Sequence, residues 1–422
     1  MRSFKYLSAV LVALLLVGWA AGQSYVIENA RIVTVSGPVI ERGGVAIENG
    51  MITQVGERVR RPRGATRIDG RGLTVYPGLF NSDTNLGLTE IGAVAVTNDD
   101  SEMGDYSPQL LAWTAIHVES EHIPVARVDG ITHAVTRPRG GAIAGQGAVI
   151  HLDGWTQEDM EVDRQGAMYI ELPSVLPISF RRFGGGGSAG SYKKAQEEFD
   201  KKTAELKELF ARVKHYSQHR EQVEVPDRQL EALIPLVEGR QLAVIEARSH
   251  ADIKNAVTFA EETGLNYVIL DADDAWRITD FLKEHDVRLI LGPRQSMPRR
   301  EDEGNDSVYE APRILQEAGI RFAIATGGSS SVRTLPFEVG NSVAHGWSRD
   351  DALRSITLTP AEFFGVDDRL GSIEEGKIAN LVVTDGDIFE YQTEIKHLFI
   401  KGKDIPLDSK HTRLYDKYKK AR

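Results

Sequence analysis

Residues 242–291 decide the expected fold, and they read LAVIEARSHADIKNAVTFAEETGLNYVILDADDAWRITDFLKEHDVRLIL. Short apolar runs alternate in this stretch with longer segments whose apolar residues recur at helical spacing. A short, continuously apolar run is typical of a strand buried on both faces, and helices between such strands indicate a parallel sheet. The predicted strands are Leu242–Ile245, Tyr267–Leu270 and Val287–Leu291, and the predicted helices are Ala251–Glu262 and Ala275–Glu284.

Similar apolar runs continue the pattern on both sides of this stretch. They lie at Leu73–Phe80, Val128–Val135, Ala148–Leu152, Met168–Leu172 and Phe322–Ala325. Eight such strands predict an α/β fold, a TIM-like (β/α)8 barrel over residues 75–368. A doubly wound open sheet is the alternative, because it produces a similar pattern.

The two ends of the chain look alike and differ from the middle. Residues 25–72 and 371–400 consist of short segments rich in β-branched residues, separated by glycine turns. Glu48-Asn49-Gly50 is a strong signal for a two-residue hairpin turn. We therefore predict one small composite β-sandwich domain built from residues 23–74 and 369–407, followed by a C-terminal tail at 408–422.

Composition and charge exclude several classes of protein. The chain has 422 residues, a formal net charge of −11 and no cysteine. The acidic balance and the lack of a basic stripe argue against a nucleic-acid partner. The absence of cysteine excludes disulfides, thiolate metal ligands and cysteine nucleophiles.

The first residues resemble a secretion signal. Arg2 and Lys5 precede the apolar run Leu7–Val17, and the segment 18–22 that follows is made of small residues apart from Trp19. That run is too short to cross a bilayer, which takes about 20 residues of helix. We predict that residues 1–22 are a cleaved signal peptide and that the mature protein is periplasmic or secreted, with no membrane segment left.

One insertion and one polar segment interrupt the barrel pattern. Residues 184–222 combine a glycine-rich loop with a long helix dense in lysine and glutamate, which indicates a solvated surface element. Residues 294–307 are polar and follow the seventh strand, so they are expected to overhang the C-terminal face of the barrel.

Three motifs resemble the amidohydrolase superfamily of metal-dependent hydrolases. Val75-Tyr76-Pro77-Gly78-Leu79-Phe80 resembles the family's first barrel strand, and Ala325-Thr326-Gly327-Gly328 resembles its last. The segment Gly371-Ser372-Ile373-Glu374-Glu375-Gly376-Lys377 and the residues after it, to Val383, resemble the return to the small β domain. The likeness covers the mature chain and is greatest to the imidazolonepropionase-like branch. It implies the barrel and composite β-sandwich predicted above, and hydrolysis of non-peptide C–N bonds in a cyclic amide or small peptide-like substrate.

The active-site positions of that family are altered here. Members usually carry His-x-His at the end of the first strand, where this chain has Asp83 and Asn85. Glu246 and Asp271 stand where histidines are expected at the ends of the fifth and sixth strands. Gly327 or Gly328 occupies the position of the catalytic aspartate, so the catalytic residue is unknown.

The remaining oxygen donors leave two interpretations open. Asp83, Asn85, Glu246 and Asp271 are candidate metal ligands, with Glu171 as a further oxygen, and such a set suits Mg²⁺, Mn²⁺ or Ca²⁺ better than zinc. The alternative, which we favour, is that these carboxylates pair with Arg137, Arg139, Arg248 or Arg294 and hold no metal. Arg137, Arg139 and Arg294 are also candidate binders of a substrate carboxylate.

Two functions follow from the same residues. The first is an exported amidohydrolase with an atypical, histidine-free metal site. The alternative is a catalytically inactive homologue that binds a small ligand or acts as a scaffold for an active relative. The expected partners are a small-molecule substrate or ligand, and an amidohydrolase paralogue or a second copy of the chain.

Overall fold

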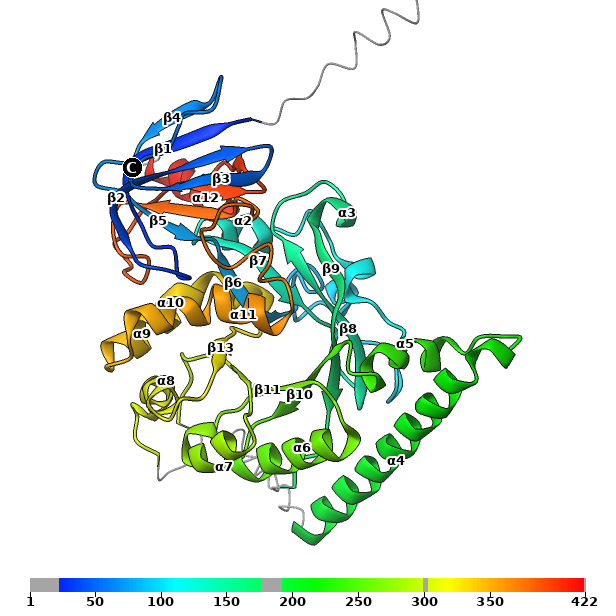
Figure 1. Cartoon of the computed structure of the whole chain (residues 1–422). Coiled ribbons are helices and arrows are strands. Elements are labelled where there is room, and N and C mark those ends of the chain that lie inside the picture. Colours follow the sequence, from blue (N-terminus) through cyan, green and yellow to red (C-terminus); the bar gives the residue numbers. More distant parts are fainter. Residues whose placement is uncertain (1–22, 176–191, 299–302, 421–422) are drawn as a thin grey trace, which may run out of the picture.

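A computed structural model describes residues 23–175, 192–298 and 303–420. The predicted signal peptide and the glycine-rich part of the insertion lie outside these residues, so both stay predictions. Among the described residues, no helix is both long enough and apolar enough to span a membrane. Figure 1 shows a small β domain above a larger ring of strands and helices.

Both ends of the chain build the small domain, as predicted. Its sheet has the order β16-β15-β14-β5-β1-β2-β3, with β4 paired to β1. The Asn49-Gly50 turn joins β2 to β3 in the expected hairpin, and both residues have positive φ, at 51° and 85°. The strands are β1 (Tyr25–Ile32), β2 (Ile40–Glu48), β3 (Met51–Gly56), β4 (Thr66–Asp69), β5 (Thr74–Pro77), β14 (Leu381–Thr384), β15 (Ile395–Ile400) and β16 (Lys403–Asp404).

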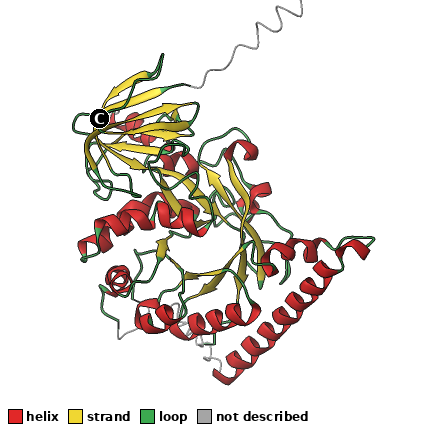
Figure 2. Ribbon diagram, viewed as in Figure 1, coloured by secondary structure: helices red, strands yellow, loops and turns green. Residues whose placement is uncertain are grey.

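A second eight-stranded sheet forms the barrel, and Figure 2 shows its strands inside a ring of helices. The order runs from β6 to β13 along the chain. Asn81 and Thr326 bring the first and last strands together, because Nδ2 of Asn81 donates to Oγ1 of Thr326 at 2.6 Å. The strands are β6 (Leu79–Thr84), β7 (Ile131–Thr136), β8 (Ile143–His151), β9 (Glu161–Glu171), β10 (Leu242–Ala247), β11 (Tyr267–Asp271), β12 (Leu289–Leu291) and β13 (Phe322–Ile324).

Helices pack around the barrel, and several begin at side-chain caps. Ser249 accepts the backbone N–H of Asp252 at the start of α6, and Gly264 ends that helix in the left-handed region. The helices are α2 (His122–Arg127), α3 (Gln157–Met160), α4 (Tyr192–Gln218), α5 (Arg228–Val237), α6 (His250–Thr263), α7 (Thr279–Glu284), α8 (Ser307–Glu317), α9 (Leu335–Ala344), α10 (Arg349–Ser355), α11 (Leu358–Phe363) and α12 (Lys410–Lys419).

The charged helix α4 lies along the outside of the barrel, beside α5 and α6 (Figure 1). Leu206, Phe210 and Val213 are its buried apolar residues, and the Phe210 ring lies 6.1 Å from that of Phe259 in α6. This narrow stripe, three and four residues apart, is enough to dock a helix whose other faces are solvated.

Two details of the sequence prediction are wrong, and one segment for which it gave no secondary structure is a helix. Strand β8 runs antiparallel to both neighbours, because only residues 137–142 separate it from β7 and a parallel connection takes a dozen or more residues. The run 73–80 is two strands, split at Gly78, and the first of them belongs to the small domain. The expected tail contains α12, which a capping box of Ser409 and Thr412 initiates.

Gly78 joins the two domains and tolerates no side chain. A Cβ at this position would lie 2.0 Å from Oγ1 of Thr132. We expect Gly78→Ala to lower the free energy of unfolding by about 1–3 kcal/mol, because overpacking forces the surrounding side chains and backbone to shift. Gly56→Ala in β3 is the matched control, since nothing lies within 4 Å of the added Cβ. Equal urea midpoints for the two variants would contradict this prediction.

Candidate functional site

The C-terminal ends of the parallel barrel strands surround a cavity of ≈ 470 Å³, which we call the barrel mouth. This is the end of a (β/α)8 barrel at which ligands and substrates bind. Five carboxylates and three guanidinium groups line it, so acidic groups are in excess by two when all are charged. The lining residues are Asp83, Arg137, Arg139, Glu171, Glu246, Arg248, Asp271, Asp273, Pro293, Ser296, Thr326, Gly327 and Gly328.

Carboxylates and guanidinium groups alternate across the mouth in one series of ion pairs. Arg137, just after β7, places Nε 2.7 Å from Oδ1 of Asp83 in β6 and Nη2 3.4 Å from Oε2 of Glu246 in β10. Arg248 continues the series, with Nη2 2.9 Å from Oε1 of Glu246 and 2.6 Å from Oδ2 of Asp271. The pairing of carboxylates with arginines, which the sequence predicts as the alternative to a metal site, is therefore present.

Burial makes these pairs electrostatically strong. Asp83 is 2% exposed and Arg137 is 8% exposed. Burial alone would lower the pKa of Arg137, but Asp83, Tyr169 and Glu246 hold that pKa above its ordinary value, so the guanidinium stays charged. Burial likewise opposes ionisation of Glu246, yet Arg137 and Arg248 keep its pKa below the usual range.

Asp271 combines a raised pKa, which Asp83 and Glu171 share, with a backbone conformation that the other carboxylates of the mouth do not have. Burial raises its pKa to about 7, against the opposing charge of Arg248. Its backbone lies in the left-handed region at φ 72°, and Ala272 follows at φ 41°. Gly292 in the next connection makes room for it, since a Cβ there would lie 2.7 Å from Oδ1 of Asp271. Such backbone strain persists only where surrounding packing imposes it and is concentrated at functional sites.

Three charged groups of the mouth lie outside the series: Arg139, Glu171 and Asp273, of which Asp273 has Arg294 as its partner, with Oδ1 3.8 Å from Nη2. Nη2 of Arg139 donates to the backbone oxygen of Gly327 at 2.5 Å, while its Nε is buried without a hydrogen-bond partner. Glu171 ends β9 with an exposed side chain and, among the described residues, has no ion pair of its own. Burial of the carboxyl and the nearby charge of Glu246 raise its pKa. A guanidinium and a carboxylate are thus available to a ligand.

Two predicted site residues are absent from the cavity lining. The side-chain amide of Asn85 forms its hydrogen bonds with neighbouring residues: Nδ2 donates to Thr89 and Asp100, and Oδ1 accepts the backbone N–H of Ser329. Arg294 is 2% exposed, and its Nε donates to the backbone oxygen of Gly292. Local hydrogen bonds keep both side chains out of the cavity lining, although Nη2 of Arg294 lies 3.8 Å from Oδ1 of the lining residue Asp273. Their roles as metal ligand and substrate binder stay predictions.

Sequence reasoning missed two contributors to the mouth. Tyr169 lies in β9 inside the barrel, and its ring centroid is 5.1 Å from Cζ of Arg137, within the range of a cation–π contact. Asp273 lines the cavity two residues after Asp271. The acidic run Asp271-Ala272-Asp273-Asp274 was a usable signal for the second residue, whereas Tyr169 gave none.

The residues present do not fit the zinc site that the family resemblance implies. Zinc sites in proteins rely on histidine or cysteine, and no histidine lines the mouth. Within the described part of the chain, no group of three or more His, Asp or Glu side chains is arranged to hold a metal ion. The charged guanidinium of Arg137 instead lies between Asp83 and Glu246.

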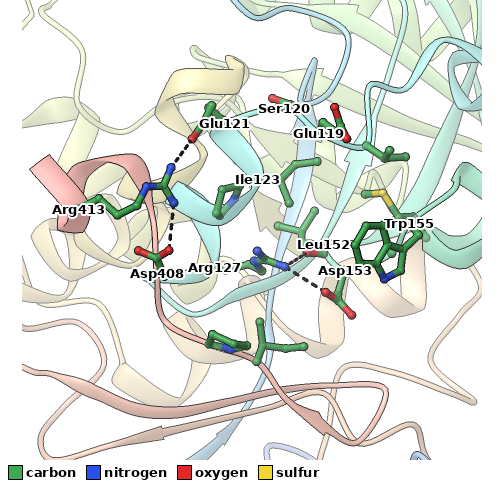
Figure 3. A pocket seen from close by; sticks show the side chains of 16 residues that line it. Glu119, Ser120, Glu121, Ile123, Arg127, Leu152, Asp153, Trp155, Asp408 and Arg413 are labelled. Atoms are coloured by element: carbon green, nitrogen blue, oxygen red, sulfur yellow. Dashed lines mark hydrogen bonds and ion pairs between the residues drawn. The ribbon is translucent and has the colours of Figure 1, made fainter.

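A second cavity, of ≈ 440 Å³, lies beside α2 and the segment leading into α12 (Figure 3). Its arginines already pair with its acids: Arg413 with Glu121 and Asp408, and Arg127 with Asp153. None of the residues singled out in the sequence lines it. The barrel mouth is therefore the better candidate.

Comparison with known proteins agrees with this architecture. By fold, the chain is similar to an amidohydrolase from Thermotoga maritima MSB8, with 23% identity and a TM-score of 0.78 over 90% of this chain and 99% of that chain. It also resembles molinate hydrolase, with 15% identity and a TM-score of 0.57 over 92% and 96% of the two chains. A Xaa-Pro dipeptidase with bound methionine gives 15% identity and a TM-score of 0.53 over 91% and 100%. No curated protein sequence matches at a significant level.

The sequence itself places the chain in a family. The profile of the Amidohydrolase family matches residues 182–405, which is more than half of the chain. The imidazolonepropionase-like branch is not distinguished by this match and stays a prediction. The superfamily predicted from the strand motifs is confirmed: the chain belongs to the amidohydrolase family.

Proposed function

We propose that this chain is a metal-independent member of the amidohydrolase family whose barrel mouth binds a small polar ligand. The observation that carries the proposal is the series of ion pairs from Asp83 to Asp271, in which each of the three carboxylates contacts Arg137 or Arg248. A buried ion pair of this kind is already compensated, so it needs no bound cation.

The groups outside that series suggest the class of ligand. Arg139 offers a guanidinium beside Gly327, and Glu171 offers a carboxylate at the end of β9. A small molecule carrying both a carboxylate and an amino group would satisfy both. The methionine bound in the Xaa-Pro dipeptidase carries both groups and is the first probe. The N-methylphosphonate-L-proline bound in a prolidase with 16% identity has a carboxylate but no free amino group, because its nitrogen is bonded to phosphorus, so it tests the contact with Arg139 alone.

Hydrolysis of an amide or small peptide-like substrate is the second candidate. Family membership and the location of the cavity at the C-terminal ends of the strands favour it. It would need a hard cation such as Mg²⁺, Mn²⁺ or Ca²⁺ held by carboxylates, and a proton acceptor other than the glycines at 327 and 328. General acid–base help contributes about 10²–10⁴-fold, so its loss together with loss of the metal would leave little turnover.

Two measurements on the same protein separate the candidates. The chain is purified without chelator or nickel affinity resin, its metal content is determined by elemental mass spectrometry, and L-methionine and N-methylphosphonate-L-proline are titrated by calorimetry. We expect no stoichiometric metal, and binding that EDTA leaves unchanged and that Arg139→Ala weakens about tenfold or more, because one charge-assisted contact is lost.

The other outcomes are equally informative. Near-stoichiometric manganese, magnesium or calcium, together with hydrolysis of dipeptides, would favour the second candidate. Stoichiometric zinc would mean that the ligands lie elsewhere in the chain. Absence of binding to either probe, with no metal, would overturn the proposed ligand class.

A further inference from the structure

Arg137 occupies an unusual place among the arginines of this chain. Its guanidinium is buried between the ends of two strands that are far apart in sequence, and it touches Asp83 through Nε and Glu246 through Nη2. The ring of Tyr169 covers it at 5.1 Å. These contacts hold a positive charge at a fixed point inside the mouth.

The carboxylates around the guanidinium of Arg137 repel one another unless a positive charge lies between them. Asp83, Glu246 and Asp271 come from β6, β10 and β11, and their side chains converge on one cavity. Carboxylates brought together in this way repel one another, and one of them must protonate unless a positive charge lies between them. Arg137 supplies that charge between Asp83 and Glu246, and Arg248 supplies it between Glu246 and Asp271.

We propose that Arg137 is a built-in substitute for a divalent cation, so that the mouth excludes metal while Arg137 is present and gains a metal site when it is removed. Oδ1 of Asp83 and Oε2 of Glu246, the carboxylate oxygens that Arg137 contacts, would be ligands of that site, while Oε1 of Glu246 stays with Arg248. Oxygen ligands of this kind suit Ca²⁺ or Mn²⁺ rather than zinc. The inference deepens the proposed function, because metal independence is one half of it.

The guanidinium of Arg137 and a divalent cation differ in charge, and this difference makes the proposal testable. Alanine at position 137 leaves space where the guanidinium lay and leaves two carboxylates without their shared partner. A divalent cation restores the lost charge and adds one more positive charge to a cavity in which acids are in excess. In the wild-type mouth the guanidinium of Arg137 already lies between Asp83 and Glu246, so these two carboxylates are not left without a positive partner.

The experiment compares wild-type protein with Arg137→Ala, after EDTA treatment, in titrations with CaCl₂ and MnCl₂. We expect saturable binding and a rise in melting temperature for the variant, with affinity at least about tenfold higher than that of the wild-type chain, a difference that calorimetry resolves easily. Arg139→Ala is the matched control, because the guanidinium of Arg139 donates to the backbone of Gly327 and not to a carboxylate. It should gain no site.

Two further variants identify the side chains that bind the ion and give the proposal further ways to fail. Adding Asp83→Asn to Arg137→Ala should abolish the gained binding, since asparagine keeps the shape but loses the charge. Arg137→Lys should exclude Ca²⁺ as the wild type does. A folded Arg137→Ala protein that binds neither ion would overturn the inference.

Measurement of metal binding by the wild-type protein tests the proposal even if Arg137→Ala fails to fold. One equivalent of tightly bound Ca²⁺ or Mn²⁺ in the wild-type protein would by itself overturn the proposal. Ligand binding by the wild-type mouth is measured separately with L-methionine and without metal, so failure of the proposed function is distinguishable from failure of this inference.

Discussion

Replacing Asp83 with alanine is expected to lower the free energy of unfolding by about 3–5 kcal/mol, because it leaves a buried guanidinium without its main partner. Asp83 is 2% exposed and lies 2.7 Å from Arg137, whose other carboxylate, Glu246, is more distant at 3.4 Å. Urea denaturation followed by circular dichroism measures the change. Asp367→Ala is the matched control, since Asp367 is exposed and such surface substitutions stay within about 0.5 kcal/mol.

A double-mutant cycle separates the ion pair from simple loss of packing. Arg137→Met keeps most of the side-chain volume and removes the charge. If the pair is the cause, Asp83→Ala combined with Arg137→Met should be more stable than Asp83→Ala alone, because no unpaired charge is left in the core. Strictly additive losses would show that the two side chains are energetically independent.

Acidification is expected to destabilise the protein through two buried histidines at the opposite end of the barrel from the mouth. Burial lowers the pKa of His133 to about 3 and holds that of His151 well below its ordinary value. The amide nitrogen of Asn380 lies 3.3 Å from Nδ1 of His133 and 3.0 Å from Nδ1 of His151. Its amide oxygen accepts from Lys401, which fixes the nitrogen as the donor, so both Nδ1 atoms must be unprotonated.

The sign of the effect follows from where protons bind. Unfolded histidine has a pKa near 6.5, so below that pH the unfolded chain takes up protons that the folded chain refuses. The stabilisation is complete above about pH 6.5 and falls by about 1.4 kcal/mol per pH unit and per histidine down to the folded pKa. Asp129 and Asp271 work against this trend, because burial raises the pKa of each to about 7 and protonation then favours the folded state.

Variants isolate the histidine contribution from that of Asp129 and Asp271. Urea midpoints are measured over several pH values for wild type, His133→Gln with His151→Gln, and His117→Gln, an exposed histidine. We expect the double variant to be less stable overall but to have a flatter acid limb, while His117→Gln retains the wild-type slope. An unchanged slope in the double variant would rule out the buried pair as the origin.

Much of the candidate site could be predicted from position in the sequence. The family resemblance put Asp83, Glu246 and Asp271 at strand ends, and the structure brings all three into the lining of the mouth, because parallel strands end at one face. Asn85 and Arg294 were expected at the same site, but their side chains do not line it. Proximity to a strand end does not say whether a side chain faces the cavity or is held by hydrogen bonds to nearby loops.

The sequence alone indicated the family, through its strand motifs, and it indicated most barrel strands and the small domain made from both ends, because these depend on local periodicity and turn residues. The division of residues 73–80 into two strands needed the structure. The short connection at 137–142 also contained the signal for the antiparallel strand β8. Only the tertiary structure decided how the charges of the mouth combine. Arg137 is 54 residues from Asp83 and 109 from Glu246, and which of several arginines meets which carboxylate depends on barrel closure and burial, which no local pattern encodes.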